Sequence, residues 1–161
     1  MNRRILLVDD NLAIHQDFQD ILDSGRQTDT AHRGMEDFHV DSAMQGREAL
    51  ELVTSAVQEK RPYAMAFVDV RMPPGWDGIE TIEHLWSIDP ALQIVLCTAY
   101  SDYSWEKMAA RLGINDKLII LKKPFDNIEV IHLARALTSK WNATHEVDLR
   151  QSRADPQDRV A

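Results

Sequence analysis

Polar groups suited to metal and phosphate chemistry directly follow four short apolar runs of this chain. These groups are Asp9 with Asp10, Asp69, Thr98, and Lys122 with Lys123. If the runs are parallel strands, their carboxyl ends meet at one edge of a sheet and bring the polar groups together. Three carboxylates gathered there repel one another, by about 1–4 kcal/mol per pair at 4 Å. A hard divalent cation relieves that repulsion, and Mg2+ is the expected one because it accepts a few carboxylates together with water.

The remaining groups at this edge suit phosphoryl transfer. A carboxylate that lies beside a bound Mg2+ and a lysine can act as a nucleophile toward a phosphoryl group. A lysine supplies a point positive charge for the phosphate, and the hydroxyl of Thr98 can donate a hydrogen bond to a phosphoryl oxygen. The convergence of these groups therefore indicates a Mg2+-dependent phosphoryl site.

An α/β framework is needed to bring these residues together. The short apolar runs alternate with segments whose apolar residues recur at helical spacing, which is typical of a parallel sheet covered by helices on both faces. The predicted strands are residues 5–8, 38–43, 64–68, 93–97 and 117–121. The predicted helices contain residues 14–22, 49–57, 79–86 and 103–112, and a fifth begins near Asp126. Right-handed crossovers should wind these units into a doubly wound sheet.

Two segments do not belong to this minimal plan. Residues 25–37 are a polar insert between the first predicted helix and the second predicted strand. After Trp141 the sequence becomes polar, and we expect the last helix to fray there and to lead into a linker or a disordered tail. The expected organisation is one domain over residues 1–140 with an extension over residues 141–161.

Composition argues against several classes of partner. The formal net charge is −8, and no cluster of Lys and Arg provides a nucleic-acid-binding surface. No apolar run is long enough to cross a membrane or to serve as a secretion signal. The single cysteine, Cys97, cannot form an intrachain disulfide, and its place in an apolar run predicts a small core residue. We expect a cytoplasmic protein that binds neither nucleic acid nor membranes.

The same sequence blocks resemble the receiver domains of bacterial response regulators. The matching segments are residues 7–10 (LVDD), residues 67–73 (FVDVRMP) with Asp77-Gly78, Thr98-Ala99, and residues 123–125 (KPF). They occur in the order of that family, and the resemblance covers about residues 5–137. It implies a five-stranded parallel sheet of the flavodoxin-like order 2-1-3-4-5, with helices on both faces.

The resemblance also implies roles for the acidic residues. Asp69 would be the phosphoacceptor. Asp10, Asp69 and the backbone carbonyl of Arg71 would bind Mg2+ directly, and Asp9 would contribute mainly through water. On this basis the chain is a signalling switch that transfers phosphate to itself and later hydrolyses it, and it is not an enzyme acting on a separate substrate.

Further implied roles concern the switch and its partners. Lys123 would pair with the phosphate, aimed by a cis Lys123–Pro124 bond, and Thr98 would be the switch hydroxyl, with the small Ala99 leaving room for access. A sensor histidine kinase would be the phosphodonor. The face formed by the fourth helix, fifth strand and fifth helix would bind a second copy of the chain or an output module.

The chain departs from the family pattern in two further places. The loop of residues 72–78 is one residue longer than usual, and Ile120 stands where the family usually has an aromatic switch residue. Tyr100, Tyr103 and Trp105 follow Thr98 closely, so we expect the loop that carries them to relay the switch. In the alternative interpretation these rings only cover the core.

Two alternative functions use the same residues differently. A phosphatase of the haloacid dehalogenase type also has an Asp nucleophile and Mg2+, but it needs a second Asp two residues later, where this chain has Arg71. A receiver-like interaction module that never takes phosphate would be expected to lack Asp69, Thr98 or Lys123, and all three are present. The sequence therefore favours a phosphorylated switch.

Overall fold

A parallel β-sheet forms the centre of the computed structural model, which describes residues 1–24, 38–99, 104–113 and 115–154. Its strands are β1 (Arg4–Val8), β2 (His39–Ala43), β3 (Met65–Asp69), β4 (Gln93–Thr98) and β5 (Leu118–Lys122). The spatial order is β2-β1-β3-β4-β5, and every neighbouring pair is parallel. The predicted strand order is confirmed, and each predicted strand boundary is correct to within one residue.

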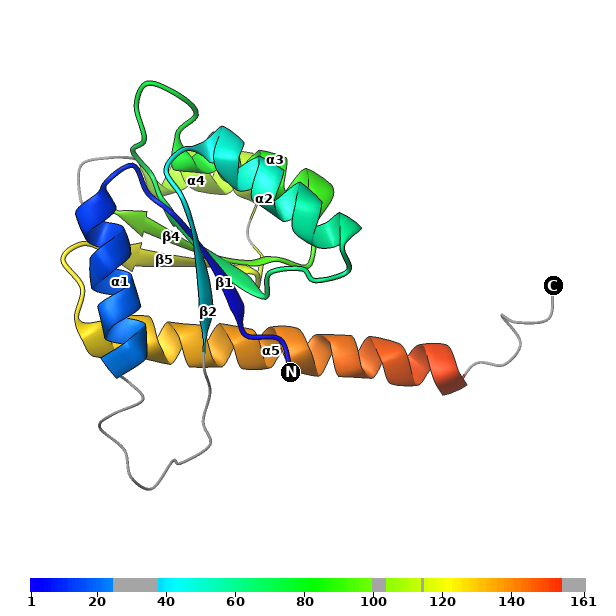
Figure 1. Ribbon diagram of the computed structural model, residues 1–161. Coiled ribbons are helices and arrows are strands. Elements are labelled where there is room, and N and C mark those ends of the chain that lie inside the picture. Colours follow the sequence, from blue (N-terminus) through cyan, green and yellow to red (C-terminus); the bar gives the residue numbers. More distant parts are fainter. Residues whose placement is uncertain (25–37, 100–103, 114, 155–161) are drawn as a thin grey trace.

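Five helices cover the two faces of this sheet. They are α1 (Leu12–Ser24), α2 (Gly46–Gln58), α3 (Gly78–Ile88), α4 (Trp105–Leu112) and α5 (Asn127–Ala154). The helices α1 and α5 pack on one face, and α2, α3 and α4 pack on the other (Figure 1). The chain is therefore a three-layer α/β structure, as the alternation of apolar runs and amphipathic segments predicts.

Alternate residues of each strand serve the two halves of the core. In β1, Leu6 and Val8 belong to the cluster under α2, α3 and α4, whereas Ile5 and Leu7 belong to the cluster under α1 and α5. This alternation follows from the two-residue period of a strand. It explains why the central strands consist of apolar residues on both faces, because neither face meets water.

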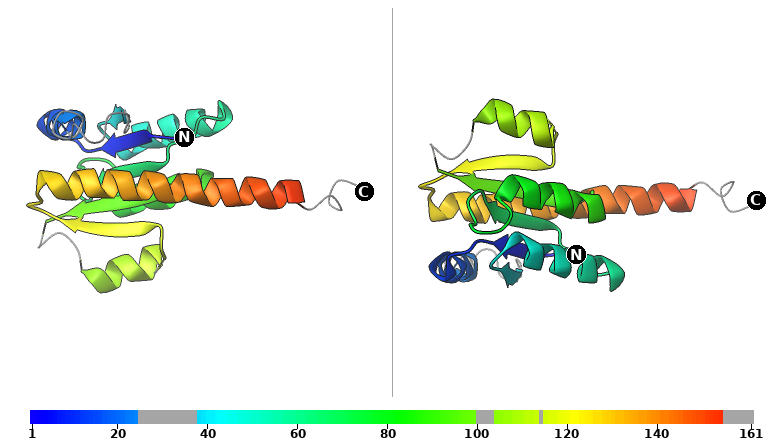
Figure 2. Two further views of the ribbon diagram at one scale, coloured as in Figure 1. Left: turned by 90° about the horizontal axis from the view of Figure 1, so that it is seen from below. Right: turned by 90° about the horizontal axis from the view of Figure 1, so that it is seen from above.

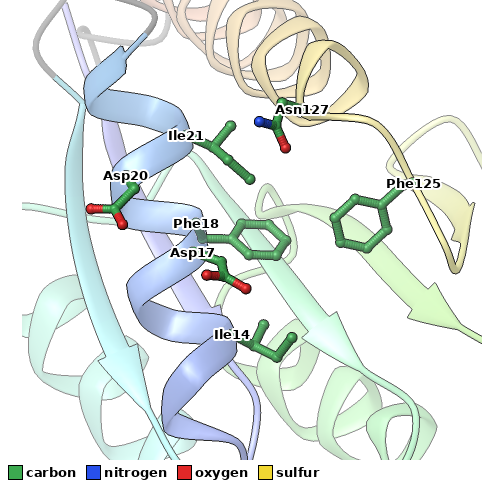
Figure 3. A pocket seen from close by; sticks show the side chains of 7 residues that line it. All are labelled: Ile14, Asp17, Phe18, Asp20, Ile21, Phe125 and Asn127. Carbon is green, nitrogen blue, oxygen red and sulfur yellow. The ribbon is translucent and has the colours of Figure 1, made fainter.

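Aromatic rings tie α1 to the sheet and to the start of α5. Phe18 of α1 makes edge-to-face contacts with Phe67 of β3, at 5.0 Å between ring centroids, and with Phe125, at 5.6 Å. A shallow pocket with Ile14 and Ile21 in its lining opens beside these rings (Figure 3). Because Phe125 lies in the β5–α5 connection, these contacts fix the short segment that also contains Lys123 and Pro124.

The last helix is longer than the sequence indicates. The helix extension expected after Trp141 is present, but the expected fraying is wrong: α5 continues to Ala154 and has 28 residues, or about 42 Å at 1.5 Å per residue. Trp141 is buried, its ring stacks on His145 at 3.5 Å, and Asn142 exchanges hydrogen bonds with the backbone of Asn2. These contacts extend the helix past the edge of the sheet (Figure 2).

Several sequence predictions concern residues beyond this description. The insert of residues 25–37 and the end of the chain from residue 155 lie outside the described residues. Within the part that is described, no helix has both the length and the apolar character required to cross a bilayer.

Candidate functional site

Three carboxylates meet beyond the carboxyl ends of β1 and β3. One carboxylate oxygen from each of Asp9, Asp10 and Asp69 lies within 4.8 Å of the others. The parallel register of β1 and β3 pairs Val8 with Val68, so Asp9 and Asp69 follow side by side. Asp9 and Asp69 are 4% and 8% exposed, whereas Asp10 is exposed to solvent. The fold therefore gathers the acidic residues that the sequence marks as metal ligands.

Lys123, the residue directly after β5, reaches this group. The Lys123 Nζ atom lies 3.0 Å from Oδ1 of Asp69, and the backbone N–H of Lys123 donates to the Thr98 carbonyl at 2.9 Å. The expected cis bond between Lys123 and Pro124 is confirmed. Lys122, by contrast, is exposed. Of the two adjacent lysines, Lys123 is thus the one that meets the carboxylates.

Backbone contacts fix the orientation of Asp9. Its N–H donates to the Ala43 carbonyl at 3.1 Å, and its Oδ1 accepts from the N–H of Asn11 at 2.9 Å. The buried ring of His15 on α1 donates from Nε2 to the Asp9 carbonyl at 2.7 Å, since a carbonyl can only accept. Sequence reasoning missed His15, because a lone histidine on a helix face carries no signal of what it will contact.

Burial changes the ionisation of these groups. Burial raises the pKa of Asp69 above the usual range of a carboxyl group, although the hydrogen bond and charge of Lys123 oppose that rise. Burial likewise raises the pKa of Asp9, against the hydrogen bond from Asn11. A pKa that is higher in the folded chain than in the unfolded chain means that ionisation costs stability as the pH rises through this interval. A cation bound beside Asp9 and Asp69 would favour their ionised forms and so offset this cost.

The pKa of Lys123 is also raised, but for an ammonium group this favours the charged form. Burial lowers the pKa of the Lys123 ammonium group, but the hydrogen bond and charge of Asp69 outweigh burial, and the pKa is raised. The ammonium group therefore remains charged at neutral pH. It is a permanent positive group at the edge of an acidic cluster.

The β3–α3 connection forms one wall of the site. The Arg71 N–H donates to the Asp69 carboxylate and opposes the rise of the Asp69 pKa. An open pocket beside the carboxylates is lined by Asp10 together with Arg71, Met72 and other residues of this loop. Arg71 thus lies next to the acidic cluster, where the family resemblance requires its backbone.

Thr98, the predicted switch hydroxyl, is the last residue of β4. Thr98 is buried, directly follows Cys97 (the register partner of Asp69), and donates its hydroxyl to the Ala99 carbonyl at 3.0 Å. Ile120 is half-buried against the core under α2, α3 and α4. Tyr100, Tyr103 and the Trp105 side chain lie outside the described residues, so the relay expected of them stays a prediction.

Cys97 is a core residue, as the sequence predicts. It belongs to the cluster under α1 and α5 and is 4% exposed. Burial raises the pKa of its thiol to about 12, so the thiolate is not populated at neutral pH. The only cysteine of the chain is therefore inert in this setting.

The donor set fits a hard divalent cation. Carboxylate oxygens are the ligands that Mg2+ prefers, and one or two carboxylates with a backbone oxygen and water are a common set. Two of the three carboxylates here are buried, and burial disfavours their ionised form. A cation at this point would offset that cost, so the residues present suit a metal.

Comparison with known proteins assigns the chain to a family. A family model for the response regulator receiver domain matches residues 5–135. The chain belongs to the response-regulator receiver family. Receiver domains are signalling switches and are generally not classical enzymes.

Curated relatives of this receiver include both short and long proteins. It is 28% identical over 130 residues to sporulation initiation phosphotransferase F of Bacillus subtilis (strain 168), covering 81% of this chain and 89% of that protein. It is 34% identical over 113 residues to the transcriptional regulatory protein ZraR of Escherichia coli (strain K12), covering 69% of this chain and 22% of ZraR. The receiver thus spans most of one relative and about a fifth of the other.

Solved structures share the receiver fold. The adenylate cyclase structure from Rhodopirellula baltica matches with a TM-score of 0.76 at 23% identity, over 96% of this chain and 100% of that chain. A response regulator receiver protein from Sinorhizobium medicae WSM419 matches with a TM-score of 0.65 at 24% identity, over 87% and 97% of the two chains. At these identities the likeness concerns the fold alone.

Proposed function

We propose that this receiver is phosphorylated on Asp69 in a Mg2+-dependent reaction. The observation that carries the proposal is the cluster of Asp9, Asp10 and Asp69, whose oxygens lie within 4.8 Å, with Lys123 Nζ 3.0 Å from Asp69. Asp10, Asp69 and the Arg71 backbone carbonyl would hold the metal directly, and Asp9 would contribute mainly through water. When bound, Mg2+ supplies positive charge for the carboxylates and the phosphoryl oxygens.

The reaction is a displacement at phosphorus. A carboxylate oxygen of Asp69 forms a bond to phosphorus while the bond between phosphorus and the donor breaks, and the donor leaves with the bonding electrons. Lys123 exchanges its contact with Asp69 for a phosphoryl oxygen and so stabilises the added negative charge. The Thr98 hydroxyl, which donates to Ala99 in the unphosphorylated chain, turns toward another phosphoryl oxygen and acts as the switch.

Mg2+ should stabilise the wild-type chain and enable its labelling by acetyl phosphate. The expected rise in melting temperature is several degrees at saturating Mg2+, because the cation binds only the folded cluster. Asp10→Ala should lose both the rise and the labelling, whereas Asp23→Ala, which removes an exposed carboxylate of α1, should retain them. Differential scanning fluorimetry and intact mass measure the two effects. Labelling that persists in the presence of a chelator would contradict the Mg2+-dependent site.

Response regulators receive phosphate from sensor kinases, and some carry output domains. The phosphodonor of this receiver is a sensor histidine kinase. The face formed by α4, β5 and α5 is the surface that binds a partner or a second copy of the chain after phosphorylation. β5 lies at the edge of the sheet, and its residues Leu118, Ile119 and Ile120 are only half-buried, whereas β3 and β4 are buried throughout. An incompletely covered edge strand suits a second copy of the chain or an output module.

Beryllofluoride with Mg2+ should raise the dimer fraction of the receiver through this face. We take residues 1–140 as the receiver domain and residues 141–161 as a helix extension with a linker or tail. A chain that ends at residue 142, which keeps buried Trp141 and the hydrogen bonds between Asn142 and Asn2, should therefore respond in the same way. Sedimentation velocity with and without beryllofluoride measures the response. An unchanged mass for the full chain would exclude the dimer, and a response lost only on truncation would contradict the domain division.

A further inference from the structure

Four residues of the β3–α3 loop (residues 70–77), which is described throughout, are shielded from solvent: Val70, Met72, Trp76 and Asp77. The Asp77 side chain caps the first turn of α3. Met72 is 1% exposed and belongs to the core under α2, α3 and α4. Trp76 is half-buried and lies outside that core, at the far end of the loop. Its contacts therefore decide how the outer part of the loop is fixed.

The Trp76 ring contacts side chains from two helices. Its ring stacks on His84 of α3, with centroids 3.9 Å apart and planes at 12°. The guanidinium carbon of Arg47 on α2 lies over the same ring, 4.8 Å from its centroid. A cation over an indole ring is attractive, and the contact is stronger where water is partly excluded. The tryptophan thus joins the loop to the beginning of α2 and to the middle of α3.

Small residues permit this close approach. A Cβ atom on Gly46, the first residue of α2, would lie 3.1 Å from the Trp76 ring and 2.2 Å from the Thr81 hydroxyl oxygen. A Cβ atom on Gly75 would lie 3.0 Å from the side-chain oxygen of Gln45. Residues 75 and 76 are therefore seated directly on the N-terminal turn of α2.

The two ends of the loop are anchored beside the acidic cluster. The Gly78 N–H donates to the Val70 carbonyl at 2.8 Å, which closes the loop at its base. A Cβ atom on Gly78 would lie 2.4 Å from the Asp69 carbonyl oxygen, so α3 begins in contact with the phosphoacceptor strand. The residues between these anchors include Arg71, and the loop lines the pocket that also contains Asp10. Displacement of the loop at Trp76 would therefore move a wall of the site.

We infer that Trp76 is a positioning residue for the Mg2+ site. By holding the β3–α3 loop on α2 and α3, it keeps the Arg71 backbone beside Asp69 and keeps the pocket at Asp10 open to the cation. This role rests on the proposed function of the cluster. It acts through the loop, because Trp76 is absent from the lining of the pocket and from the carboxylate cluster.

Trp86, on α3, provides a matched control. It is also half-buried, Lys117 Nζ lies over its ring at 5.2 Å, and its Nε1 donates to the Leu92 carbonyl. It lies near the C-terminal end of α3, away from the acidic cluster. Loss of either tryptophan removes a ring with a cation over it, but only the loss of Trp76 frees the loop.

The test is a Mg2+ titration of the full chain, in which the melting temperature is measured at each Mg2+ concentration. Trp76→Leu should raise the Mg2+ dissociation constant about tenfold, as expected for a residue that orients a metal ligand. Trp76→Phe should recover most of the affinity, since a smaller ring can still stack, and Trp86→Leu should lower stability without changing the dissociation constant. His84→Ala keeps the tryptophan and removes its stacking partner, so it should weaken Mg2+ in the same direction even if Trp76→Leu does not fold.

Phosphorylation by acetyl phosphate gives a second readout. The initial rate of Trp76→Leu should approach that of the wild type when Mg2+ is saturating, because the defect lies in metal affinity. If wild type binds Mg2+ but Trp76→Leu and His84→Ala both bind it equally well, the contacts of Trp76 do not position the site and the inference is wrong. If wild type itself shows no Mg2+ binding, the proposed function fails and the inference fails with it.

Discussion

Replacing Asp69 with Asn should abolish phosphorylation of the chain by acetyl phosphate. The amide is a poor nucleophile, while its oxygen can still accept the hydrogen bond that Lys123 Nζ gives to Oδ1. The folded structure should be retained, because burial already disfavours the charge on Asp69. Intact mass spectrometry of wild type and variant, both with Mg2+, measures the loss.

Asp89→Asn is the matched control for this experiment. Asp89 is also a buried carboxyl group whose pKa is raised by burial, but it lies at the C-terminal end of α3. This variant should be labelled as fully as the wild type. Equal labelling of Asp69→Asn and wild type would show that another residue takes the phosphoryl group.

Lys123→Ala should slow phosphorylation by about 10²- to 10³-fold, the range found when one preorganised charge-stabilising donor is removed. The reason is that Lys123 is the cation that contacts the Asp69 carboxylate, at 3.0 Å. Mg2+ should bind Lys123→Ala at least as tightly as wild type, because the loss of a nearby positive charge favours a cation. Single-turnover rates at saturating Mg2+ separate the two effects.

Lys122→Ala provides the comparison for Lys123. Lys122 is the last residue of β5, directly before Lys123, and is exposed, so its removal changes the net charge equally. Its phosphorylation rate should stay within about a factor of two of wild type, as for surface charges that make no close pair. If both variants lose the same activity, the effect is general electrostatics, and the role given to Lys123 is wrong.

The sheet and the acidic cluster could be predicted from the sequence because the strand ends are marked by a change from apolar to polar residues. Strands that are covered on both faces must be apolar throughout, so their ends are marked where polar residues begin. Asp9 and Asp69 occupy such ends, and parallel pairing of β1 and β3 brings them together without any loop detail. Local pattern and global fold agree here, which is why the strand positions and the cluster could be read in advance.

The missed features depend on contacts between distant segments or on the context of a helix. The polar sequence after Trp141 predicts fraying, yet Trp141 is buried and Asn142 binds Asn2 at the other end of the chain. The stacking of Trp76 with His84 and Arg47 likewise follows from how α2 and α3 approach each other. Composition and periodicity report which face of an element is apolar, but not which side chain of another element it meets.

Chemical trapping of the phosphorylated position tests the central claim most directly. Borohydride reduces an aspartyl phosphate to homoserine, so the labelled residue keeps a permanent mark after the protein is digested. The chain treated with acetyl phosphate and Mg2+ should contain homoserine at position 69 and nowhere else, as read by tandem mass spectrometry. Homoserine at Asp9 or Asp10, or none in a chain whose intact mass shows the phosphoryl group, would contradict Asp69 as the phosphoacceptor.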